Sequence, residues 1–202
     1  LGWIPLGMAP SFPLPAENGF RVIAERPSFS GTIRVVESER LRYLLIDGSV
    51  QTMQTKGGYP IFPYAWTLGL LPYLRPDGKD LLMIGLGGGE TVKLFSRYGI
   101  RTTAVEVDPA VAETARAHFG LPEEGFQLVV DDGRRYLRRD QQVYDFLVLD
   151  AYAGSCPPAH LFSIEAFAEM KGRLRPGGLL AVNVVVQGYR DPLAADVAAT
   201  LS

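Results

Sequence analysis

From Asp80 onward, short and continuous apolar runs alternate with segments that carry helical periodicity. The apolar runs predict strands, in chain order Leu81–Ile84, Thr102–Val107, Phe126–Val130, Asp145–Leu149 and Leu179–Val186. Because nearly every position of these runs is apolar, both faces of such strands must be buried, as they are when helices cover a parallel sheet on both sides. The alternation predicts an α/β fold with a mostly parallel sheet over residues 80–202.

Helix signals occupy the segments between these strands. Asp108 is a favoured N-cap residue, Pro109 is a favoured first residue, and Val111, Ala115 and Phe119 then recur on one face. The further helices expected are Thr91–Tyr98, Arg134–Arg139, a helix capped by Ser163 that carries Phe167, Met170 and Leu174, and Asp191–Leu201.

Residues 1–79 have a different pattern, in which β-rich runs are separated by proline and glycine. The runs are Arg21–Ala24, Thr32–Glu37, Arg42–Ile46 and Val50–Thr55, and an apolar helix is expected at Thr67–Leu74. Asp47-Gly48 lies between the third and fourth runs and is a strong signal for a two-residue hairpin turn. We therefore expect a small β-rich N-terminal layer over residues 1–79 and a second domain over residues 80–202.

Composition narrows the classes of function. The 202 residues carry a formal net charge of −2, so the chain lacks the strongly basic character of a nucleic-acid-binding domain. It has one cysteine, Cys156, which excludes an internal disulfide and a multi-cysteine metal site, and His118 and His160 lack metal-ligand spacing. No apolar run approaches the roughly 18 residues of a membrane span. We expect a cytoplasmic protein that binds no metal, nucleic acid or membrane.

Glycines and acidic residues follow four of the predicted strands directly. The run Gly85–Gly89 follows the first strand, Glu106 lies at the end of the second, Asp131-Asp132-Gly133 follows the third and Asp150 follows the fourth. Ligands of open parallel sheets bind outside the carboxyl ends of the strands, where these residues converge. Glycines let the backbone approach a ligand beside a helix N-terminus, and an acid after the second strand suits a ribose diol. Together these residues predict a nucleoside site.

Each of these features also has a purely structural interpretation. The glycine run could serve close packing, Asp108 is expected to be a helix cap rather than a ligand, and Asp132 could cap the next helix. Asp150 could be an acid in a turn. The dinucleotide fingerprint G-x-G-x-x-G is incomplete, because Glu90 occupies the position of its third glycine. An acid after the second strand together with Asp-Gly after the third favours an adenosylmethionine-type site over a dinucleotide site.

At this point the motifs resemble the spermidine synthase (polyamine aminopropyltransferase) family, a branch of the Rossmann-like, class I methyltransferase-type superfamily. The matching segments are Ile84-Gly85-Leu86-Gly87-Gly88-Gly89, Val105-Glu106-Val107-Asp108, Asp131-Asp132-Gly133, Tyr144-Asp145 through Asp150, Pro158-Ala159 with Leu161-Phe162, and Leu174-Arg175-Pro176-Gly177-Gly178. The segment from Arg42 to Gln51 is similar to the family's strand motif that ends in Asp-Gly-x-x-Gln, which favours this family over methyltransferases in general. The resemblance spans roughly residues 22–186 and implies a Rossmann-like fold.

The resemblance implies contacts to decarboxylated adenosylmethionine or adenosylmethionine as co-substrate. Gln51 would contact the tail of this donor, Glu106 would hold the ribose hydroxyls, and Asp132 would accept a hydrogen bond from the adenine amine. Pro158-Ala159 would pack near the adenine ring. The remaining predicted donor contacts are Gly85, Gly87, Gly89, Glu90 and Gly133.

The catalytic residue implied by the resemblance is Asp150, which would orient the attacking amine and help to deprotonate it. An ammonium must lose a proton before it can attack the carbon beside a sulfonium, and a carboxylate at a strand end is a suitable acceptor. The acceptor would be a small-molecule amine, no metal would be required, and the N-terminal β-hairpin layer suggests a homodimer.

The chain also departs from the family pattern. The aspartate of the Gly-Gly-Gly-Asp-Gly loop falls on Gly88, and the second aspartate of the Asp-x-x-Asp pair falls on Ala153. The family's Asp-Glu and Tyr-His-Glu elements after the Gln are not recognisable in Lys56–Trp66, where Tyr64 is the candidate for that tyrosine. A diamine would require those missing carboxylates. Three hypotheses therefore stay open: an aminopropyltransferase, an adenosylmethionine-dependent methyltransferase, and a catalytically idle nucleoside-binding module.

Two further features complete the sequence-based expectations. Helix residues with positive charge form a cationic face, which is interpreted as a solvated surface balanced by the nearby Asp131, Asp132 and Asp140; contact with an anionic substrate or a nucleic acid is the alternative. The residues of this face are Arg134, Arg135, Arg138 and Arg139. Methyltransferase-like sheets normally have seven strands, and five are countable before Ser202; with Leu1 in place of an initiator methionine, this suggests part of a longer protein.

Overall fold

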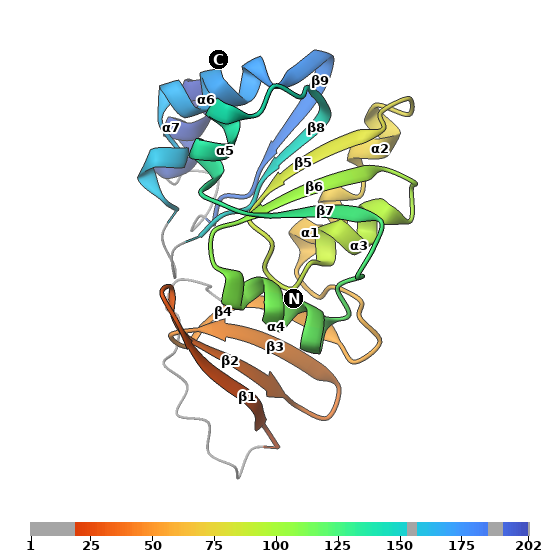
Figure 1. The fold of residues 1–202 in the computed structure, drawn as a ribbon, viewed down its shortest axis with the longest axis vertical. Helices are drawn as coiled ribbons and strands as arrows, with labels where there is room; N and C mark the ends of the chain where they lie inside the picture. The colour runs from red at the N-terminus through yellow and green to blue at the C-terminus, as the bar shows by residue number, and fades with distance from the viewer. Residues whose placement is uncertain (1–18, 153–156, 186–191, 202) are drawn as a thin grey trace.

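The computed structural model describes residues 19–152, 157–185 and 192–201. It contains two sheets that lie one above the other along the long axis of the molecule, with helix α4 (Pro109–Phe119) between them (Figure 1). The sheet near the N-terminus is antiparallel and the second sheet is parallel. This architecture confirms the predicted α/β fold, with a Rossmann-like parallel sheet and a small N-terminal β-rich layer.

The parallel sheet has five strands in the order β7-β6-β5-β8-β9. Their bounds are β5 (Asp80–Ile84), β6 (Arg101–Glu106), β7 (Phe126–Val130), β8 (Tyr144–Leu149) and β9 (Leu174–Val182). After β5 the chain adds β6 and then β7 on one side of it. The chain then returns to the other side of β5, where it adds β8 and then β9. Such a reversal opens a crevice at the carboxyl ends of the two central strands. The predicted glycine run and Asp150 follow these two strands.

Side chains of β5 alternate between two cores, which explains why the strand is apolar throughout. Leu81 and Met83 pack with Phe95 of α3 (Glu90–Ser96), whereas Leu82 and Ile84 pack into the opposite core. The helices that contribute to the opposite core are α5 (Gly133–Arg139), α6 (Ile164–Gly172) and α7 (Pro192–Leu201). Both faces of the sheet are therefore covered, as the continuous apolar runs predicted.

The N-terminal sheet is a meander of four antiparallel strands in chain order. The strands are β1 (Arg21–Ser28), β2 (Gly31–Glu37), β3 (Leu41–Ile46) and β4 (Ser49–Thr55). Asp47 and Gly48 have φ angles of 47° and 82°, and Ile46 pairs directly with Ser49. Positive φ at both central residues is the requirement of a tight two-residue hairpin, so the Asp-Gly prediction is confirmed. Helix α4 packs on this sheet, where Phe119 joins a core with Val35 and Leu44.

Two predicted elements differ from the structure. The single helix expected at Thr67–Leu74 is instead two short helices, α1 (Pro63–Leu68) and α2 (Leu71–Leu74), each with a proline in its first turn. Pro63 starts α1 earlier than the apolar pattern indicated, because proline is favoured where an N–H has no helical partner.

Strand β9 also differs, because it begins at Leu174 rather than Leu179, runs through Pro176 and ends at Val182, before the predicted end. The register against β8 shifts between Tyr144 and Phe146, and such an irregularity accommodates a residue that cannot donate a ladder bond. Leu174 thus belongs to a strand and not to the preceding helix. Val186 and Asp191, the predicted limits of two elements, lie outside the described residues, within which no helix is long and apolar enough to span a membrane.

Candidate active site

The glycine run forms a tight loop between β5 and α3. Gly85, Gly87 and Gly89 have φ angles of 93°, 53° and 76°, which favour glycine. A Cβ at Gly85 would lie 2.1 Å from the carbonyl oxygen of Asp150, and one at Gly89 would lie 2.3 Å from Leu121 Cδ1. The close-packing interpretation therefore accounts for both glycines, and this packing also holds the loop against the end of β8.

Strand β4 approaches the same loop from the N-terminal sheet. The Gly88 N–H donates a 2.8 Å hydrogen bond to Thr52 Oγ1, and a Cβ at Gly87 would lie 3.9 Å from the Gln51 carbonyl oxygen. The Gln51 side chain donates from Nε2 to the Ser49 carbonyl at 3.4 Å. Gln51 is therefore brought beside the glycine loop although more than 30 residues separate them in sequence.

Glu106 connects the end of β6 to the glycine loop. Its Oε2 accepts from the Leu86 N–H at 3.0 Å and its Oε1 accepts from the Asp108 N–H at 2.9 Å. Burial raises the pKa of Glu106 to about 7, against the lowering effect of these backbone N–H groups. Asp108 itself accepts from the Ala110 N–H at 2.9 Å at the start of α4, which confirms its prediction as a helix cap.

Asp132 lies after β7 and caps α5. One carboxylate oxygen accepts from the Arg135 N–H at 2.9 Å, and the other lies 2.9 Å from His160 Nε2. Burial raises the pKa of Asp132, but the hydrogen bonds from these two partners lower it by more, so the net pKa falls below its usual value. His160 belongs to the short 3-10 helix Ala159–Leu161, which brings Pro158 and Ala159 to the same end of the sheet. Gly133 is explained by packing, since a Cβ there would lie 2.4 Å from Ile84 Cγ2.

Asp150 is held by two side chains from distant parts of the chain. Its Oδ1 accepts from Asn183 Nδ2 at 2.8 Å, and its Oδ2 accepts from the Tyr64 hydroxyl at 3.1 Å. Burial raises the pKa of Asp150, and the two hydrogen bonds partly offset this rise. Burial and the charge of Asp150 also raise the pKa of Tyr64. Asn183 was not predicted, because it lies inside the strand expected at Leu179–Val186, whereas β9 ends at Val182 and places Asn183 directly after the strand.

Glu90 is a second acid near Asp150, in the first turn of α3. It is 6% exposed, and its Oε1 has no hydrogen-bond partner among the described residues. Burial, together with the charge of Asp150, raises the pKa of Glu90 to about 7, while Lys93 acts in the opposite direction. The Lys93 ammonium is itself held by Gln54 Oε1 at 2.9 Å and by the Phe119 carbonyl at 2.7 Å. Glu90 thus carries a buried carboxylate oxygen that nothing described in the protein satisfies.

The order of the strands arranges these groups along one edge. Asp150 follows β8, the glycine loop follows β5, Glu106 ends β6 and Asp132 follows β7, and these four strands are neighbours. Glu90 and Tyr64 lie near Asp150, and the backbone of Gln51 lies beside the glycine loop. Pro158 and Ala159 adjoin His160, which pairs with Asp132. Ala153 and Cys156 lie outside the described residues. Within the described ranges, no three His, Cys, Asp or Glu side chains group closely enough to hold a metal ion.

Comparison with known proteins shows which family this chain belongs to. The spermine/spermidine synthase domain matches residues 62–200, more than half of the chain. The chain belongs to this family. Spermidine synthase from Thermotoga maritima has the same fold, with a TM-score of 0.74 and 22% identity over 90% of this chain and 62% of that one.

Two curated relatives of this family member carry different activities in their names. An N-terminal histidine N-methyltransferase from Emericella nidulans is 29% identical over 193 residues, which cover 83% of this chain and 34% of the relative. A polyamine aminopropyltransferase from Vibrio vulnificus is 35% identical over 130 residues, which cover 60% of this chain and 43% of the relative. The chain thus spans less than half the length of each.

Proposed function

We propose that this chain is a transferase domain that binds decarboxylated adenosylmethionine along the edge described above and transfers its aminopropyl group to an amine. Glu90 carries this proposal, because its buried carboxylate oxygen lacks a partner close to the catalytic candidate Asp150. A buried carboxylate is stabilised by a cationic partner. The terminal ammonium of an aminopropyl group is such a partner.

The nucleoside would occupy the part of the edge between the glycine loop and β7. Glu106 would accept hydrogen bonds from the ribose hydroxyls, since a carboxylate has lone pairs beyond those that Leu86 and Asp108 use. Asp132 would accept from the adenine amine beside Pro158 and Ala159. The positive φ angles of Gly85, Gly87 and Gly89, and the absence of a side chain on Gly133 at the start of α5, would let the backbone come close to the donor.

The transfer step would take place at Asp150. The ammonium of the acceptor loses a proton to the Asp150 carboxylate. The nitrogen of the resulting neutral amine forms a bond to the aminopropyl carbon beside the sulfonium, the carbon–sulfur bond breaks, and the product nitrogen carries the positive charge. The electron pair of that bond goes to sulfur, which leaves neutral methylthioadenosine. A raised pKa makes Asp150 a better proton acceptor than an ordinary aspartate. Tyr64 and Asn183 would hold its two oxygens in position.

Charge at the tail end favours the decarboxylated donor. Adenosylmethionine carries a carboxylate on its tail, and this group would lie near two acids, Glu90 and Asp150. Like charges in a poorly hydrated site repel strongly. A tail with an ammonium and no carboxylate avoids this repulsion and satisfies Glu90. Gln51 would contact the same tail.

Methyl transfer is the second candidate function. It is supported by the Emericella nidulans relative, whose alignment covers 83% of this chain. In that case the donor is adenosylmethionine, and the product is adenosylhomocysteine. The idle nucleoside-binding module is supported by Gly88, which stands where the family loop carries its aspartate.

Calorimetry with two product nucleosides separates these functions. We expect the chain to bind methylthioadenosine more tightly than adenosylhomocysteine, and to release methylthioadenosine when supplied with the decarboxylated donor and a panel of primary amines. Tighter binding of adenosylhomocysteine would favour methyl transfer. Binding without release across the whole amine panel would favour the idle module, and no binding of either nucleoside would contradict all three.

A further inference from the structure

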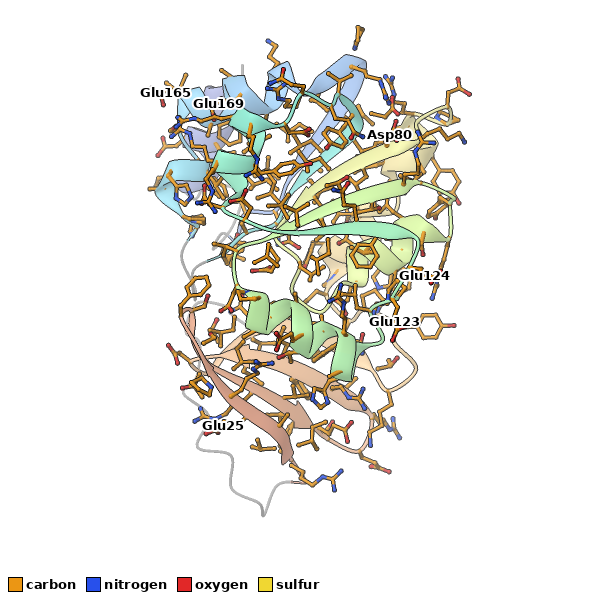
Figure 2. The ribbon with its side chains drawn as sticks, in the orientation of Figure 1. Glu25, Asp80, Glu123, Glu124, Glu165 and Glu169 are labelled. Atoms are coloured by element: carbon orange, nitrogen blue, oxygen red, sulfur yellow. The ribbon has the colours of Figure 1, made fainter. Side chains whose placement is uncertain are left out.

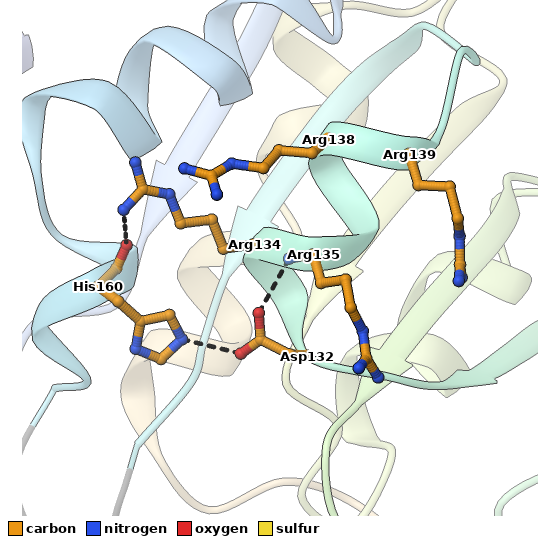
Figure 3. Close-up of a pocket in the computed structure, with 6 residues that line it drawn as sticks. All are labelled: Asp132, Arg134, Arg135, Arg138, Arg139 and His160. Atoms are coloured by element: carbon orange, nitrogen blue, oxygen red, sulfur yellow. Dashed lines mark hydrogen bonds and ion pairs between the residues drawn. The ribbon is translucent and has the colours of Figure 1, made fainter.

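His160 and Asp132 line a groove of about 660 Å³ beside α5 (Figure 3). This volume lies within the range of small-molecule binding sites in proteins. His160 Nε2 lies 2.9 Å from Asp132 Oδ2, and the Arg135 N–H donates to Asp132 Oδ1 at 2.9 Å. The carboxylate that the proposed function assigns to the adenine amine is therefore held at both of its oxygens.

The charge of Asp132 determines which nitrogen of His160 carries the hydrogen. Although burial raises the pKa of Asp132, the hydrogen bonds from Arg135 and His160 bring it below its usual value, so the carboxyl group is ionised at neutral pH. An ionised carboxylate only accepts hydrogen bonds. His160 Nε2 must therefore be the donor in this pair.

The segment that carries His160 is anchored next to its ring. The His160 carbonyl accepts from Arg134 Nη1 at 3.2 Å, as Figure 3 shows. Leu161 is 3% exposed and packs in the same core as Ile84, and its N–H donates to the Pro158 carbonyl at 2.9 Å. These contacts fix the short 3-10 helix against α5, so the ring approaches Asp132 from a defined position.

The cationic side chains of α5 pair with acids other than Asp132. Their carboxylate partners are Asp131 and Glu169. The arginines concerned are Arg134, Arg135, Arg138 and Arg139. Asp132 thus receives its side-chain hydrogen bond from His160 and not from the guanidinium groups around it.

The Asp132–His160 pair remains accessible to a ligand. The side chains of His160 and Asp132 are 50% and 36% exposed. Each carboxylate oxygen has more than one lone pair, so Asp132 can accept a further hydrogen bond while His160 and Arg135 stay in place. A base that covers Asp132 removes water from it, and a carboxylate without water needs donors in its place. His160 supplies one that remains when water leaves.

We propose that His160 is a positioning residue for recognition of the donor's base, and that its Nε2–H holds Asp132 so that the carboxylate accepts from the 6-amino group of adenine. This inference rests on the proposed function, which places the adenine at Asp132. A 6-oxo purine presents an acceptor where adenine presents a donor, and it would leave Asp132 facing another oxygen. The pair therefore selects a 6-amino purine.

The test is calorimetry with methylthioadenosine and with methylthioinosine, which carries a 6-oxo group instead of the amine. The wild-type chain should bind methylthioadenosine about 100-fold more tightly than methylthioinosine. His160→Ala should weaken methylthioadenosine binding by about tenfold and narrow the gap between the two nucleosides. His160→Gln keeps a side-chain N–H and should recover most of the lost affinity.

Steady-state kinetics give a second readout. His160→Ala should raise the KM for the donor by about tenfold and leave kcat nearly unchanged, because it removes binding and not chemistry. The catalytic candidate Asp150 follows β8, and strands β6 and β5 separate β8 from β7.

His118 offers matched controls. It lies in the last turn of α4 and lines a separate small cavity with residues of β1 and β2. His118→Ala and His118→Gln should therefore leave both nucleoside affinities unchanged. Circular dichroism of each variant shows whether it remains folded.

The outcomes separate this inference from the proposed function. Unchanged affinity in His160→Ala, an equal loss for both nucleosides, or no recovery in His160→Gln would overturn the role of His160 and leave the proposed transfer standing. If the wild-type chain did not bind methylthioadenosine, the donor site itself would be contradicted, and the inference with it. Binding without turnover would count against the transfer alone, and the affinity comparison would still decide the role of His160.

Discussion

The buried acids of this chain differ in what neutralises them. Asp80 and Asp145 lie at the amino end of the parallel sheet, where Arg101 pairs with Asp80, Arg75 pairs with Asp145 and Arg175 pairs with both (Figure 2 labels Asp80). Glu90 and Asp150 lie at the carboxyl end without such arginines among their described partners. A buried charge that the fold leaves uncompensated is typical of a functional site. The carboxyl end is therefore the end at which we propose the transfer.

Glu90 provides a prediction about stability and pH. Its folded pKa of about 7 lies above the ordinary value of 4.5. The contribution of Glu90 to stability therefore falls as pH rises from about 4.5 to 7, because in this range the unfolded chain binds fewer protons at this group. Glu90→Gln removes the buried charge. We expect it to be more stable than wild type at pH 8 by about 2 kcal/mol, with the difference vanishing near pH 5. Urea unfolding at the two pH values measures this.

The matched control is Glu123→Gln, at an exposed position (Figure 2), which should change stability little at either pH. If Glu90→Gln were destabilising at pH 8, its carboxylate would have a partner in the folded chain, and the assignment to a ligand ammonium would be wrong.

Asp150 provides a prediction about activity. Asp150→Asn keeps the shape of the side chain but cannot accept the proton of the amine, so turnover should fall by about 100-fold or more. Methylthioadenosine affinity should change little, because the nucleoside contacts involve other residues. Initial rates of methylthioadenosine release, together with calorimetry, separate the two effects. Unchanged turnover would remove Asp150 from the mechanism.

At the scale of elements, the glycine loop packs against three other segments of the chain. It packs on β4 through Thr52, on the end of β8 through the Asp150 carbonyl, and on the segment after α4 through Leu121. The glycines were predicted from sequence as a ligand cradle or as close packing. The spacing of glycines cannot decide between these two, because both require the same absence of side chains.

A pair of glycine variants tests this packing. Gly89 and Gly99 have similar φ angles of 76° and 67°, but a Cβ would clash with Leu121 only at Gly89, since nothing lies within 4 Å at Gly99. Gly99→Ala should cost about 1 kcal/mol from backbone strain. Gly89→Ala should cost about 2 kcal/mol more, from overpacking. Urea unfolding of both variants gives the difference, and equal losses would show that Leu121 moves aside freely.

At the scale of the molecule, helix α4 packs into the cores of both sheets. Ala112 and Ala115 pack into the core of the parallel sheet, whereas Val111 and Phe119 pack into the core of the N-terminal sheet. The division predicted near residue 80 describes the change in sequence pattern and stays a prediction as a domain boundary. Since α4 serves both cores, neither sheet is fully buried without the other.

Phe119→Ala tests this coupling. Phe119 is 1% exposed, and its truncation should cost about 3–5 kcal/mol. Both sheets should unfold in one transition, with tryptophan fluorescence and far-ultraviolet circular dichroism giving the same midpoint. Phe29→Ala is the control, because Phe29 is 67% exposed and its loss should have little effect. Two separate transitions would show that the sheets fold independently.

The homodimer stays a prediction, which sedimentation would test.

The sequence by itself determined the parallel sheet, the Asp-Gly hairpin and the strand ends that carry Glu106, Asp132 and Asp150. These are local properties, since apolar periodicity and turn residues act over a few positions. It missed the break between α1 and α2, because proline and apolar signals compete there.

Only the tertiary structure decided which partners these acids have. Tyr64 and Asn183 meet Asp150 across 86 and 33 residues of sequence, and Asp132 meets His160 from another loop. The unpartnered oxygen of Glu90 and the two carboxylates shared by four arginines are likewise results of packing. Burial and charge balance depend on the whole fold, because each is a sum over neighbours that are distant along the chain.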